Sequence, residues 1–525
     1  MKKYYIFLLS ISLIMLTACS DFLELTPQDS LSPTTYYNTA AEVEKAVNGI
    51  YQVLTTQGGA SFILNPEVIS DNCVYSSASG SEWLAFTKGA LNPSTSYVEE
   101  KWTKDYQGIA RANLVIYNLQ NRPDIIISDA HRLQYEGEAR FLRAYFYADL
   151  LNYFGGVPLI DEPKESLREY NLPRSTAEET LEFILTDVNR AIECLNDDAP
   201  VNYKGRATSG AALVLKARVL LYNKRYEEAY SALKALDEQG KYQLLTDYSA
   251  IFDPQNENNA EVIFDIQYSN PSNSNSSYSF YSYIKEWSGG YIPTVSLAED
   301  YYELRGTPPE FPPRKFGDMF KNRDNRMEVT LTRPMDNWGD KVYKPVAKDK
   351  TYYNSCLKVK KYLVYSDITN SNKRSTLNII VYRYADALLM QAECIIESDS
   401  LYDIKRTEAI SLLNNVRNRA GMPNITDIIA NPTREELRDI MRRERRCELA
   451  FENTRYDDLR RWRIAEDVLN EPAYGYDPAA YEGGVWEKYI IDDNRMFLPH
   501  HYLWPIPQSE MDANTAIGGQ QNPGY

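Results

Sequence analysis

The segment Arg442–Trp462 restricts the fold of this chain more than any other stretch. Drawn as one helix with 100° between residues, it places Glu444, Glu448 and Arg455 on the face that carries the apolar side chains, and Arg446 on the opposite face. A carboxylate on a buried face is too costly in free energy to stay unpaired, and arginine can bind it through two parallel hydrogen bonds. We therefore expect Glu444, Glu448 and Arg455 to form a structural ion-pair network, with Arg455 as the nearest partner of the glutamates.

Two other interpretations of this segment stay open. It could hold a catalytic pair of carboxylates, or it could be an exposed helix whose Glu–Arg pairs contribute only about 0.2–0.5 kcal/mol each. The chain has three histidines, and none has the spacing of a metal site. We expect no catalytic residue, no metal and no cofactor. The net charge of −16 argues against nucleic acid as a partner, because phosphate binding needs a basic surface.

The first residues are typical of a bacterial lipoprotein precursor. Two lysines precede the apolar run Tyr4–Leu16, which is too short to cross a bilayer, and small residues then lead to Cys19. We predict a signal peptide over residues 1–18, lipid attachment at Cys19 and a lipid-anchored tether over residues 19–35. Several acyl chains on one cysteine suffice for stable anchoring. The alternative is an ordinary secretory signal with an incidental cysteine.

Apolar residues at helical spacing predict a mostly α protein. Two capping boxes, Thr176 with Glu179 and Thr433 with Glu436, each predict the start of a helix. The other predicted helices are Ala40–Val53, Tyr97–Gln120, Arg132–Phe154, Ala211–Asn223, Tyr226–Leu236, Tyr384–Glu397 and Thr407–Ala420. The pair 211–236, with small residues, a short turn and then Y-E-E-A, is similar to a tetratricopeptide helix hairpin.

The helical pattern is interrupted in the middle of the chain. From Asp253 to about Trp338 the period of 3.6 residues is lost. Short strands are predicted at Glu261–Gln267, Glu328–Thr332 and Lys358–Val364. Irregular insertions on a regular scaffold are where binding surfaces usually lie, so we expect the ligand site there.

Several ordered motifs together resemble the SusD/RagB family over nearly the whole chain. They are Gly137–Tyr145 (G-E-A-R-F-L-R-A-Y), Phe154–Leu159 (F-G-G-V-P-L), Gly205–Thr208, Arg383–Glu393 (R-Y-A-D-A-L-L-M-Q-A-E), Val416–Gly421, Glu444–Glu452, Asp458–Trp462 and Leu503–Glu510. The resemblance implies a mostly α fold in which tetratricopeptide-like helix pairs form a SusD-like scaffold that carries loop and short-strand insertions. It divides the chain into an N-terminal helical region over residues 36–252, ligand-binding insertions over residues 253–365 and a C-terminal region over residues 366–525.

The same resemblance implies a function without enzymatic activity. Members of this family are surface lipoproteins of the outer membrane that cover a SusC-like, TonB-dependent transporter. They capture an oligosaccharide, or sometimes a peptide, and pass it to that transporter. The expected location is therefore the cell outer membrane, with the lipid anchor at Cys19 and the protein exposed on the surface.

Aromatic residues in loops are the candidates for the ligand site, because sugar rings dock on aromatic faces while polar side chains bind the hydroxyls. Placed by analogy with the family, the candidates come from three regions. They are Asp71, Asn72, Tyr75, Trp83, Tyr283, Trp287, Tyr291 and Trp338. Each aromatic residue among them is equally suited to core packing.

Two alternative functions stand beside nutrient binding. A surface glycoside hydrolase needs two carboxylates in a cleft, and Glu444 with Glu448 is the only suggestive pair. A tetratricopeptide adaptor between proteins would need no small ligand. Glycan hydrolysis would favour the first, and binding of a partner without any glycan or peptide would favour the second.

Overall fold

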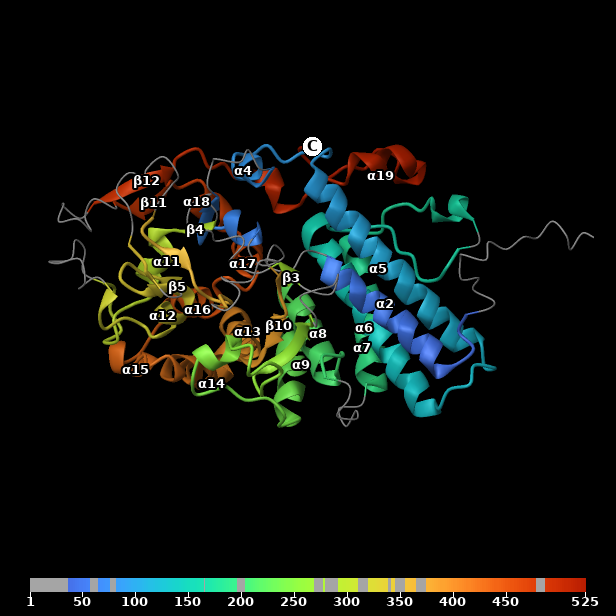
Figure 1. The fold of residues 1–525 in the computed structure, drawn as a ribbon, viewed down its shortest axis with the longest axis horizontal. Coiled ribbons are helices and arrows are strands. Elements are labelled where there is room, and N and C mark those ends of the chain that lie inside the picture. The colour runs from blue at the N-terminus through green and yellow to red at the C-terminus, as the bar shows by residue number, and fades with distance from the viewer. Residues whose placement is uncertain are drawn as a thin grey trace, which may run out of the picture.

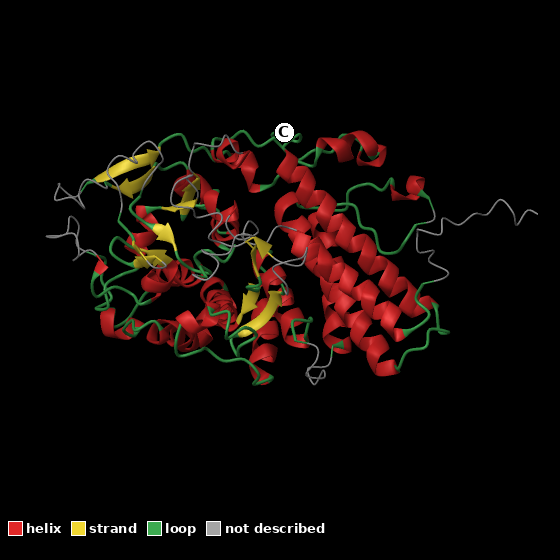
Figure 2. Ribbon diagram, in the orientation of Figure 1, coloured by secondary structure: helices red, strands yellow, loops and turns green. Residues whose placement is uncertain are grey.

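The computed structural model describes most of the chain and confirms a mostly α fold (Figure 2). The described residues are 36–56, 65–75, 82–164, 166–195, 204–268, 277–278, 291–309, 320–338, 341–344, 355–364, 374–477 and 487–525. The predictions for the signal peptide, the tether, Cys19, Tyr283 and Trp287 lie outside these ranges.

Long helices form one half of the molecule. Their bounds are α2 (Ala40–Thr56), α5 (Ser96–Asn121), α6 (Asp129–Phe154), α7 (Ala177–Cys194), α8 (Ser209–Tyr222) and α9 (Tyr226–Glu238), with the short α4 (Glu82–Thr87) before α5. Helices α2, α5, α6 and α7 lie side by side, and α8 packs on both α7 and α9 (Figure 1). The hairpin predicted from Y-E-E-A is α8 with α9.

The other half mixes helices with short strands. Its helices are α11 (Val295–Asp300), α12 (Arg326–Thr330), α13 (Tyr384–Glu397), α14 (Asp399–Arg419), α15 (Ile425–Ile428), α16 (Arg434–Leu449), α17 (Arg455–Arg461) and α18 (Ala465–Leu469). The last helix, α19 (Gln508–Ala513), lies back against the half with the long helices (Figure 1). Helix α13 packs on α14, α16 and α9, so it joins the two halves. One continuous cluster of buried apolar residues extends through both of them.

The described strands form antiparallel pairs that join segments far apart in the chain. The pairs are β1 (Cys73–Tyr75) with β4 (Tyr291–Pro293), β2 (Val262–Ile266) with β10 (Ile379–Arg383), β3 (Ser277–Tyr278) with β9 (Arg374–Ser375), β5 (Leu331–Thr332) with β8 (Lys358–Val359), β6 (Asn337–Trp338) with β7 (Lys341–Val342), and β11 (Ala473–Tyr476) with β12 (Lys488–Asp492). The pair β1–β4 brings two predicted site regions together.

Local chemistry explains why several helix ends were predictable. In both capping boxes the threonine hydroxyl accepts from the backbone N–H three residues on, and the glutamate accepts from the threonine N–H at 2.7 Å. Helix α6 ends at Gly155, whose φ of 75° suits glycine. The boundaries of α13 match the prediction to the residue.

Three predictions about local structure were wrong. Residues 328–330, predicted as strand, belong to α12, and only Leu331–Thr332 is extended. Of the predicted strand 358–364, only Lys358–Val359 pairs with a neighbour. The segment 442–462 is not one helix, because α16 ends at Leu449 and α17 starts at Arg455. Between them Phe451 and Asn453 have φ of 60°, which interrupts the helix.

Candidate functional site

Two of the predicted ligand residues meet across the strand pair β1–β4. Tyr75 and Tyr291 are cross-strand partners, and their ring centroids lie 5.4 Å apart at an interplanar angle of 78°. Tyr291 is buried and its hydroxyl donates a hydrogen bond to Asn65 Oδ1 at 2.5 Å. Tyr75 is half-buried, so its ring is the part of this pair that solvent reaches.

The polar residues just before β1 are held by arginines. Arg446 and Arg455 each lie 2.8 Å from a carboxylate oxygen of Asp71. Burial raises the pKa of Asp71, but the two guanidinium groups outweigh it and hold this pKa well below its usual range. Asn72 accepts from Arg446 Nε at 2.8 Å and donates to Glu67 at 2.7 Å. Asn72 has an exposed fraction of 0%, and these hydrogen bonds hold the start of β1 in place; its ligand contact stays a prediction.

Trp83 belongs to an aromatic cluster. Its ring centroid lies 4.0 Å from that of Tyr97 and 5.9 Å from that of Phe86, and Phe86 in turn packs against the buried Trp504. Trp83 is half-buried, so it contributes to this packing and keeps part of its ring accessible. Trp338 lies in β6, where it pairs with Lys341 of β7, and its side chain is outside the described part.

The two glutamates of α16 are held by arginines from other elements. Glu444 binds Arg326 at 2.6 Å and Arg417 at 3.0 Å. Glu448 is fully buried, and its carboxylate pairs with Arg326 at 2.9 Å, with Arg383 at 2.5 Å and with Arg419. Burial raises the pKa of Glu448, but these guanidinium groups hold it well below its usual range.

The predicted composition of this network was wrong for Arg455. Arg455 lies in α17 and binds Asp71, because the chain turns after Leu449 and carries this residue off the face of α16. Arg446, expected to point away, is buried beside Asp71 and Asp300. Sequence reasoning missed Arg383, Arg417 and Arg419, although all three lie in the quoted motifs 383–393 and 416–421.

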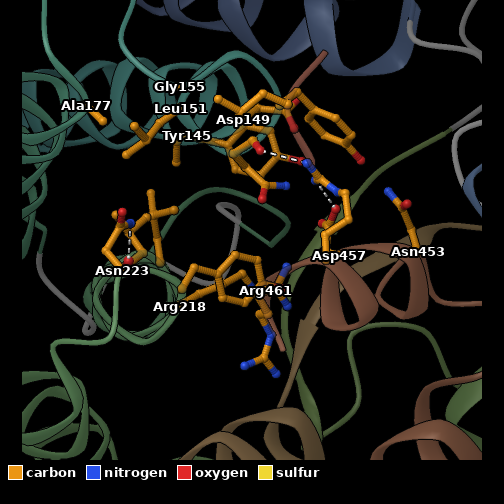
Figure 3. A pocket seen from close by; sticks show the side chains of 18 of the residues that line it. Tyr145, Asp149, Leu151, Gly155, Ala177, Arg218, Asn223, Asn453, Asp457 and Arg461 are labelled. Carbon is orange, nitrogen blue, oxygen red and sulfur yellow. Dashed lines mark hydrogen bonds and ion pairs between the residues drawn. The ribbon is translucent and has the colours of Figure 1, made fainter. Parts of the chain in front are cut away.

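A pocket of about 370 Å³ opens between the two halves (Figure 3). Its walls come from the C-terminal parts of α6 and α8, from β10, and from α17 with the loop before it. Polar and aromatic side chains line it, among them Tyr145, Asn152, Arg218, Tyr222, Tyr382 and Asn453. No motif indicates this pocket, because each of its walls comes from an ordinary helix or strand.

Three further properties of the described residues bear on metal binding, thiol chemistry and membrane insertion. No group of three or more His, Cys, Asp or Glu side chains there is arranged to hold a metal ion. The cysteines in those ranges are buried and form no disulfide with one another, and burial raises the pKa of Cys73. Nowhere in the same ranges is there a helix of sufficient length and hydropathy to span a bilayer.

Two family models match the chain. The model described as "SusD family" matches residues 260–525, and the model described as "Starch-binding associating with outer membrane" matches residues 21–221. The chain is 27% identical to SusD-like protein P38 of Formosa agariphila, with 94% of this chain and 99% of that protein covered. It is 25% identical to a SusD-like protein of Bacteroides ovatus, with 93% of this chain and 86% of that protein covered.

Solved structures share the fold. A SusD-like protein from Bacteroides fragilis has a TM-score of 0.80 at 26% identity and covers 95% of this chain and 100% of its own. A second protein from that organism, described as a SusD-like carbohydrate binding protein, has a TM-score of 0.80 at 25% identity, with 92% and 100% covered. The predicted scaffold of helix pairs with irregular insertions is thereby confirmed.

Proposed function

This chain belongs to the SusD family, and from that membership we propose that it is a cell-surface lipoprotein that binds a carbohydrate and delivers it to a SusC-like, TonB-dependent transporter of the outer membrane. The observation that carries the proposal is the pair of family matches, which together reach from residue 21 to residue 525. One of them describes starch binding in association with the outer membrane, and a related protein of known structure is described as carbohydrate binding.

The ligand surface that we propose is centred on Tyr75, at the edge of the pair β1–β4. The half-buried ring of Tyr75 packs against the buried ring of Tyr291, with 5.4 Å between their centroids. It therefore offers a fixed flat surface, which suits the face of a sugar ring. The rigid ion pairs of Asp71 hold the start of β1 in place. Trp83 and the predicted residues Tyr283, Trp287 and Trp338 remain part of this proposal.

The proposed activity is binding without catalysis. A glycoside hydrolase needs a general acid whose pKa is raised. The pKa of Glu448 is lowered instead, and Glu444 and Glu448 both form ion pairs with arginines inside the fold. This pair therefore supports packing and not hydrolysis. Release of reducing ends from glycans incubated with the purified protein would overturn this part of the proposal.

The proposed ligand surface can be tested on the full chain, purified in mild detergent and applied to a glycan array. Tyr75→Ala is expected to weaken binding of the best glycan by about two- to tenfold, because an aromatic face contributes roughly 0.5–1.5 kcal/mol. Tyr117→Ala, on the exposed side of α5, is the matched control and should bind as the parent does. An equal loss of glycan affinity in both variants would contradict the assignment of the ligand surface to Tyr75. If the protein binds peptides and no glycan, the ligand is a peptide.

The proposed anchor gives a separate prediction. Cys19→Ala removes the sulfur atom whose acylation the predicted motif requires. The variant is expected to leave the membrane fraction, while the parent protein stays with it after cell fractionation and immunoblotting. Ser20→Ala, one residue on, should remain membrane-bound. A Cys19 variant that stays in the membrane fraction would refute lipid attachment at this cysteine.

A further inference from the structure

The pocket between α6, α8, β10 and α17 is lined by phenol hydroxyls that form no hydrogen bond with the described part of the chain. Tyr145, Tyr222 and Tyr382 all line it, and none of their hydroxyls forms a hydrogen bond with any described residue. Burial raises the pKa of all three tyrosines, so the hydroxyls stay protonated at neutral pH and remain donors as well as acceptors. Three such groups around one cavity suit a ligand with several hydroxyls.

Arg218 adds a guanidinium group, only some of whose N–H groups are hydrogen-bonded to described residues. Its guanidinium group lies 4.5 Å from the centroid of the Tyr382 ring and binds Asp386 through Nη2 at 2.6 Å. Its Nε and Nη1 atoms form no hydrogen bond within the described ranges, and the side chain is 19% exposed. Figure 3 shows Arg218 on α8 and Arg461 on α17 at the same side of the pocket. A guanidinium edge of this kind is suited to an oxyanion.

The charge balance of the pocket favours a negative ligand. Each acidic residue in its wall has a basic partner of its own: Asp149 binds Lys101, Asp457 binds Arg460, and Glu452 binds Arg383. On the basic side, Lys224 and Arg463 stand exposed at the mouth, and neither forms an ion pair with a described residue. The pocket is therefore a local positive site in a chain of net charge −16.

The size of the pocket limits the ligand. A volume of about 370 Å³ lies at the lower end of the range for small-molecule sites, roughly 300–1,000 Å³. It has room for one or two sugar rings and not for a folded partner. The side-chain amides of Asn152 and Asn453 also line it and form no hydrogen bond with the described residues, so they add donors and acceptors for ring hydroxyls.

We propose that this pocket is a second carbohydrate site, separate from the surface at Tyr75, and that it takes a sugar unit carrying a carboxylate or sulfate group. The guanidinium of Arg218 binds the oxyanion, and the hydroxyls of Tyr145 and Tyr222 bind the ring. This proposal rests on the proposed function and adds to it a site and a class of sugar.

The test measures binding to the full chain in detergent by isothermal titration. The probes are digalacturonic acid for the carboxylate, a sulfated disaccharide for the sulfate ester, maltose as the neutral sugar, and inorganic sulfate. At least one acidic sugar is expected to bind at least about tenfold more tightly than maltose, since a charge-assisted hydrogen bond is worth roughly twice a neutral one. Its affinity should fall as salt is raised. If inorganic sulfate binds as tightly as the acidic sugar, the assignment of the pocket to a sugar is overturned.

Three variants locate the site. Tyr222→Phe removes only a hydroxyl and is expected to weaken binding of the acidic sugar about fivefold, the effect of one neutral hydrogen bond. Arg218→Lys keeps the charge beside Asp386 but removes the planar guanidinium group that can bind an oxyanion through two hydrogen bonds. It should weaken binding of the acidic sugar at least about tenfold. Lys224→Gln removes an exposed charge and should weaken binding of the acidic sugar about two- to fivefold. Tyr117→Phe, far from the pocket in α5, is the control and should have no effect.

The outcomes separate this proposal from the proposed function. Glycan binding that depends on Tyr75 but is unchanged by Tyr222→Phe and Arg218→Lys would overturn the second site and leave the proposed function intact. Failure of every glycan on the array, acidic ones included, would overturn both. Acidic-sugar binding that the pocket variants weaken and Tyr75→Ala does not would support two separate sites.

Discussion

Replacing Glu448 by alanine is expected to lower the free energy of unfolding by about 3–5 kcal/mol, because the change leaves buried arginines without their carboxylate. Arg326 and Arg383 are each only 1% exposed, and both bind this side chain directly. Removing one partner of a buried network costs much more than its net contribution, since the remaining charges cannot reach water. Urea denaturation followed by circular dichroism measures the change in the midpoint.

Asp439→Ala is the matched control for Glu448→Ala. Asp439 lies in the same helix, α16, but is exposed, and the substitution should change the free energy of unfolding by less than about 0.5 kcal/mol. A Glu448 variant that unfolds at the same urea concentration as this control would show that the network does not stabilise the fold.

The contribution of Glu448 should also depend on pH. Its pKa is lower in the folded protein than its usual value of 4.5, so the unfolded chain binds this proton more readily than the folded one. The stabilisation is therefore present above about pH 4.5 and declines as the pH falls toward the folded pKa. The difference between the parent protein and the variant should be constant from pH 6 to 8, at about 3–5 kcal/mol, and shrink in acid.

The second large effect is expected at Gly156, where Gly156→Ala should destabilise the protein by about 3 kcal/mol, the upper end of the range for overpacking. An added Cβ would lie 2.0 Å from the carbonyl oxygen of Ser175 and 2.7 Å from the carbonyl carbon of Thr176. Both are backbone atoms, and Thr176 is the capping residue of α7, so neither can move without disturbing that helix start. The denaturation assay used for Glu448 measures this effect.

The same substitution of glycine by alanine is expected to stabilise the protein at Gly49. Gly49 lies inside α2, and an added Cβ there meets no atom within 4 Å. Alanine is favoured over glycine in a helix by about 1 kcal/mol, so this variant should be slightly more stable than the parent. Destabilisation by both substitutions to the same extent would contradict the steric explanation for Gly156.

The helices could be predicted because their determinants are local. Thr176 and Glu179 are three residues apart, and the hydrogen bonds between them form as soon as the helix starts. Residues 328–330 show the opposite case. The β-branched Val329 and Thr330 favour a strand. Arg326, which binds Asp324, Glu444 and Glu448, nevertheless holds this segment in the short helix α12. A short segment follows such contacts more than its own propensity.

The candidate site was predicted only in part. Loop context and residue type identified Tyr75 and Tyr291, but their pairing depends on the register of β1 with β4. The same reasoning chose Asn72, whose burial follows from the position of Arg446 in a distant helix. The pocket around Arg218 and Tyr222 was missed, because nothing within α8 shows which element packs opposite these residues.

By itself the sequence determined most of the long helices, the two capping boxes, the family and the need of Glu444 and Glu448 for arginine partners. Those properties follow from neighbouring residues or from the free-energy cost of an unpaired buried charge. Only the tertiary structure decided which arginines these are, namely Arg326, Arg383, Arg417 and Arg419. It also decided which walls enclose the pocket. Both depend on distances between segments far apart in the chain, and helix packing, not local propensity, sets those distances.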